Sequence, residues 1–442
     1  MVELKPILMT VLMFAGLFIG LFLGHPLAFV LGGLAVIFGL FSWGPACFPL
    51  FVNRILGLTD NFILVAIPMF ILMANLLMYS GVADDLFDSL RYLMGPLKGG
   101  IALAVVIVCT VFAACTGVIG ASVVSMGLLA LPMMIRYGYD KKLTAGTIMA
   151  GGTLGILIPP SIMLIVMGDQ SGLSVGKLYI GSVVPGLVLS ALFMLYIAIR
   201  CAMRPGLGPP LSLEERQQVS MKKKLMMASV SLVPPVLLII GVLGAIFSGF
   251  ATATEAAGVG AFLALLMTMG YRRFSWKMVK ETTVSTAKTV SMVMIVLVGA
   301  TCFTGVFMGM GGGKTLTSLL LGLGLGKWGT FVLMNFIVFI LGSLIDWIGI
   351  VYITFPIFLP IAVELGFDPV WFVVILAVNL QTSFLTPPFG YALFYMKGIA
   401  SKELTTAGIY QSVVPFLILQ LIGVAICVLF PDMILVPASW IK

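Results

Sequence analysis

The stretch GGTLGILIPPSIMLIVMG, residues 151–168, places two consecutive prolines in the middle of a segment that is otherwise apolar enough to enter a membrane. Residues 379–398, NLQTSFLTPPFGYALFYMKG, repeat this arrangement. Proline lacks a backbone N–H and clashes with the carbonyl four residues earlier, so each pair predicts a helix that breaks near its centre. A break at mid-membrane leaves polar backbone that must be satisfied by protein or by a ligand.

The composition is typical of a protein that crosses a membrane many times. Of 442 residues, 61% are hydrophobic and 9% are charged, whereas a soluble domain carries roughly a quarter charged residues. The apolar segments fall at about 6–23, 27–41, 60–79, 100–135, 143–168, 183–203, 226–247, 251–270, 285–309, 328–361, 369–396 and 408–430. The net charge of +8 comes from Lys and Arg in short loops, the pattern that orients membrane helices, so we expect no nucleic-acid partner.

Basic residues predict the side of the membrane on which each loop lies. The linker 204–224, together with Arg200, holds six basic residues against two acidic ones, which assigns it to the cytoplasm. Segment 100–135 has basic residues at both ends and is interrupted by CTGVIGAS at 115–122. It therefore predicts a hairpin that enters and leaves the membrane on one side, which requires protein or a water-filled cavity around its tip.

The two halves of the chain predict inverted repeats. Five crossings separate Lys142 from Lys314, so a second hairpin, interrupted by GSLIDWIG at 342–349, opens on the opposite face. Matching residues lie 228 positions apart: Leu131-Pro132 with Leu359-Pro360, Asp140 with Asp368, and Pro159-Pro160 with Pro387-Pro388. Repeats of opposite orientation are typical of transporters that bind substrate near the midplane, where broken helices meet.

The sequence therefore predicts an all-α polytopic membrane protein with two inverted repeats, each with a re-entrant helical hairpin and a proline-broken transmembrane helix. The predicted parts are scaffold spans 1–81, an interfacial arm 82–98, a first repeat 99–203 (hairpin 99–136, broken helix 141–170, span 183–203), a cytoplasmic linker 204–224, scaffold spans 225–309, a second arm 310–326 and a second repeat 327–430 (hairpin 327–366, broken helix 369–396, span 408–430). The arms could hold a moving hairpin domain or be ordinary connectors.

Each break offers sites for two kinds of ligand. The prolines should release the carbonyls of Gly155 and Ile156 in the first break and of Ser383 and Phe384 in the second. Sodium is a hard cation that suits oxygen ligands at the negative end of a helix. The second half of each broken helix begins just after the prolines and offers N–H groups to an anion.

The hairpin tips should supply the remaining ligands. Small residues at the first tip allow close backbone approach, and Asp346 at the second tip is an acidic residue among apolar neighbours. Such a residue is a functional candidate that needs a counter-cation, although it could also cap the helix that starts at residue 347. Hydroxyls beside the breaks could likewise bind ligands or only satisfy freed backbone. We predict sodium ligands at Thr116, Gly117, Gly155, Ile156, Ser343, Asp346, Thr382 and Ser383, and substrate contacts at Gly120, Ser122, Pro160, Ser161, Thr386 and Pro388.

These motifs resemble a known family. GTLGILIPPS after a small-residue hairpin tip, and TSFLTPPFGYALFYMKG after LPIAVELGFDP, are similar to the large membrane subunit of TRAP (tripartite ATP-independent periplasmic) transporters. The resemblance covers nearly the whole chain. It implies an elevator mechanism driven by a sodium gradient in the bacterial inner membrane. It also implies two partners, a small four-helix membrane subunit and a periplasmic binding protein that delivers an organic anion such as a carboxylate or sulfonate.

Other functions fit the sequence less well. A proton-coupled transporter or antiporter of the same superfamily stays open, because Asp346 could titrate. An intramembrane enzyme is disfavoured, since His25 is the only histidine and Asp346 has no aspartate partner. MGGGKT at 310–315 lacks the first glycine of a phosphate loop, because Met308 stands in its place. We therefore expect at least two sodium sites and no ATP, haem or zinc.

Overall fold

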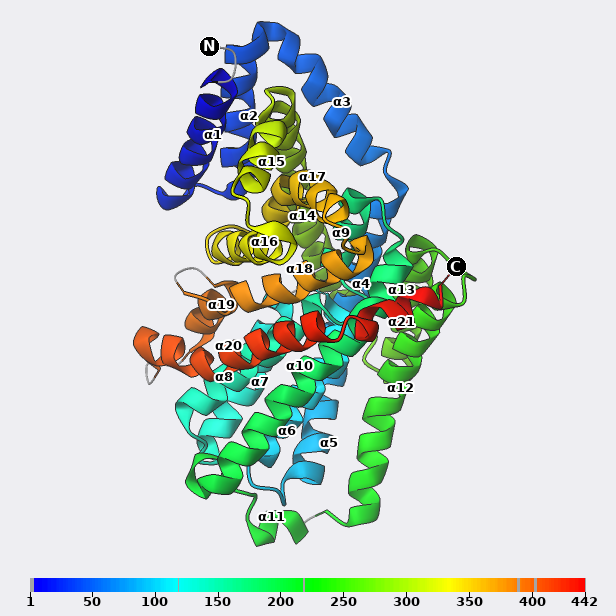
Figure 1. The fold of residues 1–442 in the computed structure, drawn as a ribbon. Coiled ribbons are helices and arrows are strands. Elements are labelled where there is room, and N and C mark those ends of the chain that lie inside the picture. The colour runs from blue at the N-terminus through cyan, green and yellow to red at the C-terminus, as the bar shows by residue number, and fades with distance from the viewer. Residues whose placement is uncertain (1–3, 118, 218, 388–389, 401–403, 442) are drawn as a thin grey trace.

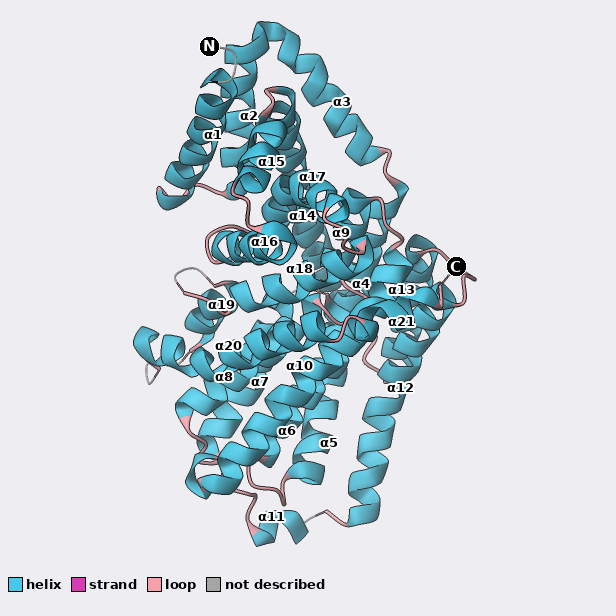
Figure 2. Ribbon diagram, in the orientation of Figure 1, coloured by secondary structure: helices cyan, strands magenta, loops and turns pink. Residues whose placement is uncertain are grey.

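The structure is a computed structural model that describes residues 4–117, 119–217, 219–387, 390–400 and 404–441. Every regular element in these ranges is a helix, with no β-strand among them (Figure 2). Eight helical segments in the described part are long and apolar enough to cross a membrane, and several shorter apolar helices accompany them. The predicted all-α membrane fold is confirmed.

The helices follow one another along the chain with short connections (Figure 1). They are α1 (Leu4–Phe22), α2 (Leu27–Trp43), α3 (Phe48–Thr59), α4 (Ala66–Tyr79), α5 (Val82–Met94), α6 (Gly100–Thr116), α7 (Ile119–Arg136), α8 (Lys141–Thr153), α9 (Ile162–Ser171), α10 (Val175–Met203), α11 (Leu213–Gln217), α12 (Met221–Phe247), α13 (Ala253–Gly270), α14 (Trp276–Gly309), α15 (Gly312–Gly322), α16 (Gly326–Gly342), α17 (Trp347–Glu364), α18 (Pro369–Ser383), α19 (Tyr391–Ile399), α20 (Thr406–Leu429) and α21 (Asp432–Ser439). Short 3-10 turns lie at Gly44–Cys47, Phe62–Val65, Leu154–Ile156 and Pro205–Leu207.

Both proline pairs interrupt helices. Between α8 and α9 the chain passes through the 3-10 turn Leu154–Ile156 and an irregular segment that holds Pro159 and Pro160. Between α18 and α19 the helix ends at Ser383, four residues before Pro387. The hairpin segments are interrupted as well. Helix α6 ends at Thr116 and is capped by Gly117, whose positive φ of 58° favours glycine. Residues 343–346 separate α16 from α17.

Some boundaries differ from the predicted ones. The predicted span 285–309 starts too late, because α14 already begins at Trp276, where the Ser275 side chain accepts a hydrogen bond from the Met278 N–H at 3.1 Å. An N-cap of this kind starts a helix even in a basic, polar segment. Helices α3 and α21 lie in stretches where no separate element was predicted.

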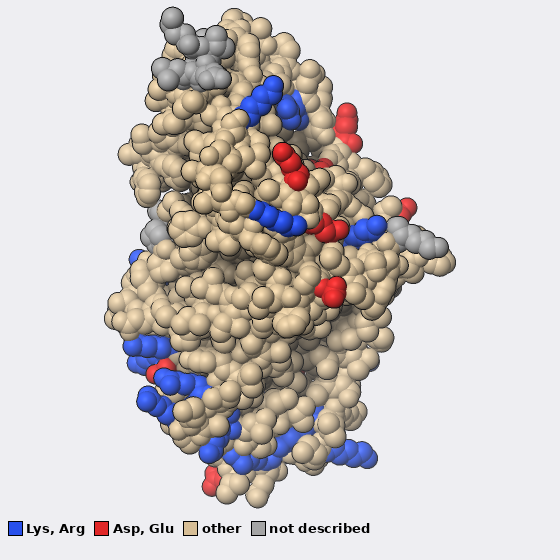
Figure 3. All heavy atoms as spheres, in the orientation of Figure 1, with Lys and Arg blue, Asp and Glu red and all other residues tan. Residues whose placement is uncertain are grey.

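The scaffold helices form one packed group. Helix α14 contacts α2, α3 and α4, α4 contacts α13, and α12 contacts both α13 and α5. Many of their outward-facing apolar side chains are exposed, for example Val230, Leu237 and Ile240 on α12, as expected for a surface that faces lipid. Lys and Arg gather at the end of the molecule that carries α11 (Figure 3), which agrees with a cytoplasmic placement of the linker.

Helices from the two predicted repeats pack against each other. Helix α9, from the first repeat, packs on α17 of the second, and α19 of the second packs on α7 of the first. Helix α8 likewise packs on α20, and α18 on α10. Helix α18 is buried on every face from Trp371 to Ser383, so it lies at the centre of this body. The inverted orientation of the repeats stays a prediction.

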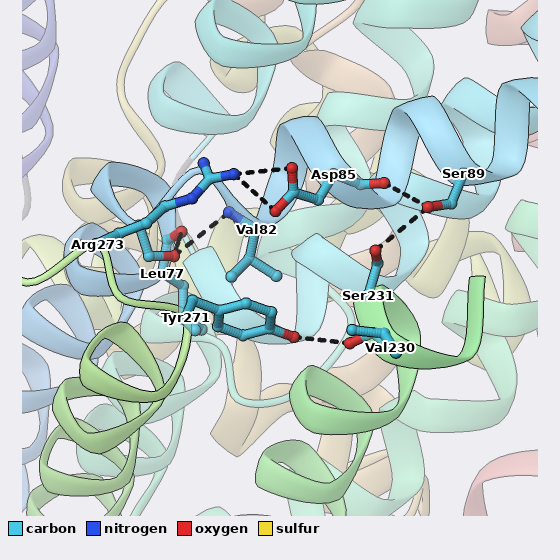
Figure 4. Close-up of polar contacts among 9 residues, drawn as sticks. Leu77, Val82, Asp85, Ser89, Val230, Ser231, Tyr271 and Arg273 are labelled. Carbon is cyan, nitrogen blue, oxygen red and sulfur yellow. Dashed lines mark hydrogen bonds and ion pairs between the residues drawn. The ribbon is translucent and has the colours of Figure 1, made fainter. Parts of the chain in front are cut away.

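Helix α5, the predicted first arm, is joined to the scaffold by polar contacts (Figure 4). Arg273, in the connection between α13 and α14, donates to both carboxylate oxygens of Asp85 at 2.9 and 2.8 Å. The hydroxyls of Ser89 and Ser231 lie 3.2 Å apart. Gly81 has a φ of 69°, and a Cβ atom there would lie 1.9 Å from an Arg273 nitrogen. The arm therefore starts at a glycine that leaves room for the arginine.

Candidate functional site

A cavity of about 300 Å³ lies where the two predicted repeats meet the predicted scaffold helices α2 and α14. Both hairpin tips and both broken helices line it, together with residues from the start of α2 and the middle of α14. Its lining residues are Pro26, Leu27, Ala28, Phe29, Gly117, Ile119, Gly120, Ile156, Ile162, Thr289, Met292, Val293, Ile295, Val296, Asp346, Trp347, Ile348, Tyr391 and Tyr395. Its volume suits a small molecule.

Four helices begin at this cavity. The first residues of α7, α9, α17 and α19 are Ile119, Ile162, Trp347 and Tyr391, and all four line the cavity. The N-terminus of a helix carries unpaired N–H groups and partial positive charge, which favour an anion. The breaks and the hairpin tips thus direct four positive helix ends to one place.

Asp346 is the only acidic or basic side chain among the described lining residues. It is half-buried and occupies the N-cap position of α17, with extended φ and ψ of −64° and 145°. Its carboxylate lies near the backbone N–H groups of Trp347 and Ile348, yet no hydrogen bond in the described structure closes the cap. The carboxylate oxygens are therefore positioned to coordinate a cation beside the cavity.

The first hairpin tip touches the first break. A Cβ atom built on Gly117 would lie 3.3 Å from the carbonyl oxygen of Pro160 and 3.4 Å from the backbone nitrogen of Ile162. At the first break, the Ser161 hydroxyl donates to the carbonyl of Ile156, and the Tyr179 hydroxyl donates to the carbonyl of Ser161 at 3.2 Å. The expectation that Ile156 presents a carbonyl without a partner is wrong, because the nearest hydroxyl takes one of its two lone pairs.

The second hairpin tip touches the second break in the same way. A Cβ atom on Gly342 would lie 2.4 Å from the Cβ atom of Ser383. The predicted free carbonyls of this break have partners too. Ser383 accepts from the Thr386 N–H at 3.0 Å, and Phe384 accepts from the Ala392 N–H at 3.2 Å. Tight turns after the end of α18 supply these donors. The loss of helical hydrogen bonds at the prolines does not by itself predict them.

Five of the predicted hydroxyl ligands, Ser161, Ser343, Thr382, Ser383 and Thr386, donate to nearby backbone. Ser343 donates to Ile340 at 2.8 Å, Thr382 to Val378 at 3.4 Å, Ser383 to Asn379 at 3.4 Å and Thr386 to Thr382 at 3.0 Å. Ser161 caps α9 by accepting from the Leu164 N–H at 3.4 Å. A hydroxyl that donates one hydrogen bond keeps lone pairs for a cation, so capping and ligation are compatible here.

The structure places the remaining predicted residues as follows. Gly155 is buried in the 3-10 turn of the first break, and Pro160 is buried beside it. Ser122 lines a separate cavity of about 110 Å³, with Asp84 and Ser125, whereas Gly120 lines the larger one; its role as a substrate contact stays a prediction. The two residues are two positions apart on α7, so their side-chain directions differ by about 200° around the helix. Pro388 and the side chain of Thr116 lie outside the described residues.

Sequence reasoning missed several cavity residues. Tyr391 and Tyr395 lie one helical turn apart on α19, and this spacing was visible directly after the second proline pair. A Cβ atom on Gly120 would lie 2.7 Å from the Tyr395 ring, so this glycine lets the ring rest on the first hairpin tip. Thr289 on α14 carries no comparable signal, because its neighbours form an ordinary membrane-spanning pattern.

Comparisons with known proteins give a consistent result. A family model described as the tripartite ATP-independent periplasmic transporter, DctM component, matches residues 12–433. The C4-dicarboxylate TRAP transporter large permease protein DctM of Pseudomonas aeruginosa is 32% identical over 386 residues, covering 87% of this chain and 88% of that protein. The isethionate TRAP transporter permease protein DctMQ of Oleidesulfovibrio alaskensis is 32% identical over 346 residues, covering 78% of this chain and 53% of that longer protein.

A solved structure, that of the Alcanivorax borkumensis YdaH transporter, resembles this chain with a TM-score of 0.60. The match covers 97% of this chain and 99% of the other, at 16% sequence identity. At this identity the likeness concerns the fold alone.

Proposed function

This chain belongs to the DctM component family of tripartite ATP-independent periplasmic transporters, and on that premise we propose that it is the membrane subunit of a sodium-coupled importer of a small organic anion. Family membership and the eight apolar segments make it a multi-pass protein of the bacterial inner membrane. Its relatives are named as permeases and not as enzymes.

The meeting of four helix N-termini at one cavity is the observation that carries the anion proposal. The first residues of α7, α9, α17 and α19 line a space of about 300 Å³, and such ends favour carboxylate or sulfonate groups. The names of two relatives specify C4-dicarboxylate and isethionate, which carry these groups. The apolar remainder of the lining fits the carbon skeleton of a small acid.

The carboxylate of Asp346 supports coupling to a cation. An anionic substrate would enter a cavity in which Asp346, the one charged side chain among the described lining residues, is also negative. Like charges in a low-dielectric site repel strongly. A sodium ion held by Asp346 and by the oxygens of the tips and breaks would remove this repulsion. Substrate would then bind well only when the cation is bound, which is the requirement for symport.

The partners and the motion are parts of the same proposal. A tripartite system needs a small membrane subunit and a periplasmic binding protein beside this chain. The body formed by the two repeats would carry the cavity past the scaffold as an elevator. Helix α5, fixed to the scaffold by Arg273 and Asp85, supports a division into a static and a moving part.

Uptake into liposomes tests the proposal. The chain would be reconstituted with its small membrane subunit, and uptake of a radiolabelled C4-dicarboxylate and of isethionate would be measured with the binding protein outside. We expect accumulation under an imposed sodium gradient, and none when either the gradient or the binding protein is omitted. Equal accumulation under a proton gradient without sodium would overturn the sodium proposal and favour proton coupling through Asp346.

A further inference from the structure

A cluster of three polar side chains lies inside the body formed by the two repeats, where α8, α18 and α20 meet. The amide nitrogens of Gln381 and Gln420 donate to the hydroxyl of Thr153 at 3.3 and 3.4 Å. The Thr153 hydroxyl in turn donates to the carbonyl of Ala150 at 2.8 Å. All three side chains are fully buried. We name Thr153, Gln381 and Gln420 the Thr153 cluster.

The cluster joins equivalent positions of the two repeats. Gln381 follows Thr153 by 228 positions, the same separation that relates the two proline pairs in the sequence. Residues that are equivalent in two repeats touch each other only where the symmetry axis passes between them. The Thr153–Gln381 hydrogen bond therefore joins the two broken helices at matching positions of the predicted repeats.

The cluster also lies directly before both breaks. Thr153 is the last residue of α8, and the 3-10 turn of the first break begins at Leu154. Gln381 precedes Thr382 and Ser383, the last residues of α18. Each hairpin tip contacts the break of its own repeat, so a movement at either break reaches the Thr153 cluster within a few residues.

The Thr153 cluster is fully buried, and each of its two amides has a hydrogen-bond partner only at its nitrogen. The amide oxygens of Gln381 and Gln420 have no hydrogen-bond donor among the described residues. Each amide is thus fixed by its N–H bond to Thr153, and loss of the Thr153 hydroxyl would release both amides together. A buried polar contact of this kind specifies one alignment of the helices that it joins.

We infer that the Thr153 cluster is a positioning element that couples the two breaks, so that a cation bound at one break aligns the other. The inference rests on the proposed sodium coupling. A cation at the first break would hold the end of α8 and therefore Thr153 in place. The hydrogen bond from Gln381 to Thr153 would then hold the end of α18, where the predicted ligands Thr382 and Ser383 lie. Close packing of the interior transmits such a displacement, and the coupling must act equally in both directions.

The sodium dependence of uptake tests this inference. Thr153→Val keeps the side-chain shape and removes the hydroxyl, whereas Thr153→Ser keeps the hydroxyl. We expect wild type to show a sigmoidal sodium curve. Thr153→Val should show a Hill coefficient near one and a half-saturating sodium concentration raised about five- to tenfold, because it removes the hydroxyl to which both amides donate. Thr153→Ser should restore most of the steepness.

Two further variants separate coupling from folding. Gln381→Met breaks the same contact from the other repeat and should flatten the sodium curve even if Thr153→Val is poorly produced. Gln411→Met, on the exposed face of α20 where Gln411 accepts from Lys142, is the matched control and should leave the curve unchanged. A purely structural role would lower the amount of protein and the maximal rate without changing the steepness.

The outcomes distinguish this inference from the proposed function. Sodium-driven uptake in wild type, with the same steepness in Thr153→Val and Gln381→Met, overturns the coupling role and leaves the proposed function standing. Uptake that is independent of sodium in wild type overturns the proposed function and the coupling role together. A flattened curve in both variants, with a normal curve in Gln411→Met, supports the inference.

Discussion

Replacement of Gly342 by alanine should weaken sodium binding through a steric effect at the second hairpin tip. Gly342 is the last residue of α16, and its Cα hydrogen faces the buried side chain of Ser383 at the second break. A Cβ atom on Gly342 would lie 2.4 Å from the Ser383 Cβ atom and 2.5 Å from its Oγ atom. The tip and the break must therefore separate to admit one methyl group.

The structure gives the sign and size of this effect. Cβ atoms in contact stay more than about 3.4 Å apart, so the two elements must move by about 1 Å, and overpacking of this kind costs about 1–3 kcal/mol. Intrinsic helix propensity acts in the opposite direction, because alanine favours a helix over glycine by up to about 1 kcal/mol. If sodium binding requires the tip and the break together, the half-saturating sodium concentration should rise about 5- to 150-fold.

The assay is sodium-dependent uptake in liposomes, with thermal unfolding of the purified protein measured alongside. Gly322→Ala is the matched control, because Gly322 is the last residue of α15 and a Cβ atom there meets nothing within 4 Å. This control should keep the wild-type sodium curve and unfold at the same or a higher temperature. A wild-type sodium curve in a normally produced Gly342→Ala protein would refute the argument that tip and break form one cation site.

Two further predictions concern charged side chains. Asp346→Asn should abolish sodium-driven uptake while assembly with the small subunit stays intact, as checked by co-purification; uptake with unchanged sodium dependence would exclude Asp346 as a ligand. Arg273→Gln removes a half-exposed bidentate ion pair with Asp85, so it should lower the free energy of unfolding by at most about 1 kcal/mol. This loss of unfolding free energy should be smaller in about 1 M salt. Lys277→Gln removes the exposed 3.9 Å pair with Glu281 and should leave the unfolding free energy unchanged. Equal effects of the two variants would contradict a stabilising role for the Arg273–Asp85 contact between α5 and the scaffold.

The sequence located the elements that carry the site because each has a local cause. The proline pairs at 159–160 and 387–388 indicated the breaks after α8 and α18. A proline pair does not by itself decide a break, since Pro234 and Pro235 lie within the continuous helix α12. The hairpin interruption at Gly117 follows from a run of small residues, and the one before α17 from Asp346 among apolar neighbours. These features depend on a few adjacent residues, and no tertiary structure is needed to detect them.

The remaining features depend on contacts between distant segments. Ser122 and Gly120 are two residues apart, yet only the packing of α7 decides that they line different cavities. The carbonyl of Ile156 accepts from the Ser161 hydroxyl, and the carbonyl of Phe384 accepts from the Ala392 N–H. Neither donor follows from the positions of the prolines alone. The part of α14 that lines the cavity has no distinguishing pattern, because a helix facing a cavity and one facing lipid are both apolar.

The packing of helices from the first half of the chain on helices from the second half has a consequence for synthesis of the protein. When the ribosome has delivered α7 and α9, the partners on which they pack, α19 and α17, have not yet been translated. Gln420, which donates to the Thr153 hydroxyl, is likewise translated 267 positions after Thr153. The first half must therefore reside in the bilayer as an unfinished intermediate, and its small-residue hairpin and broken helix need protection by the insertion machinery until the last helices arrive.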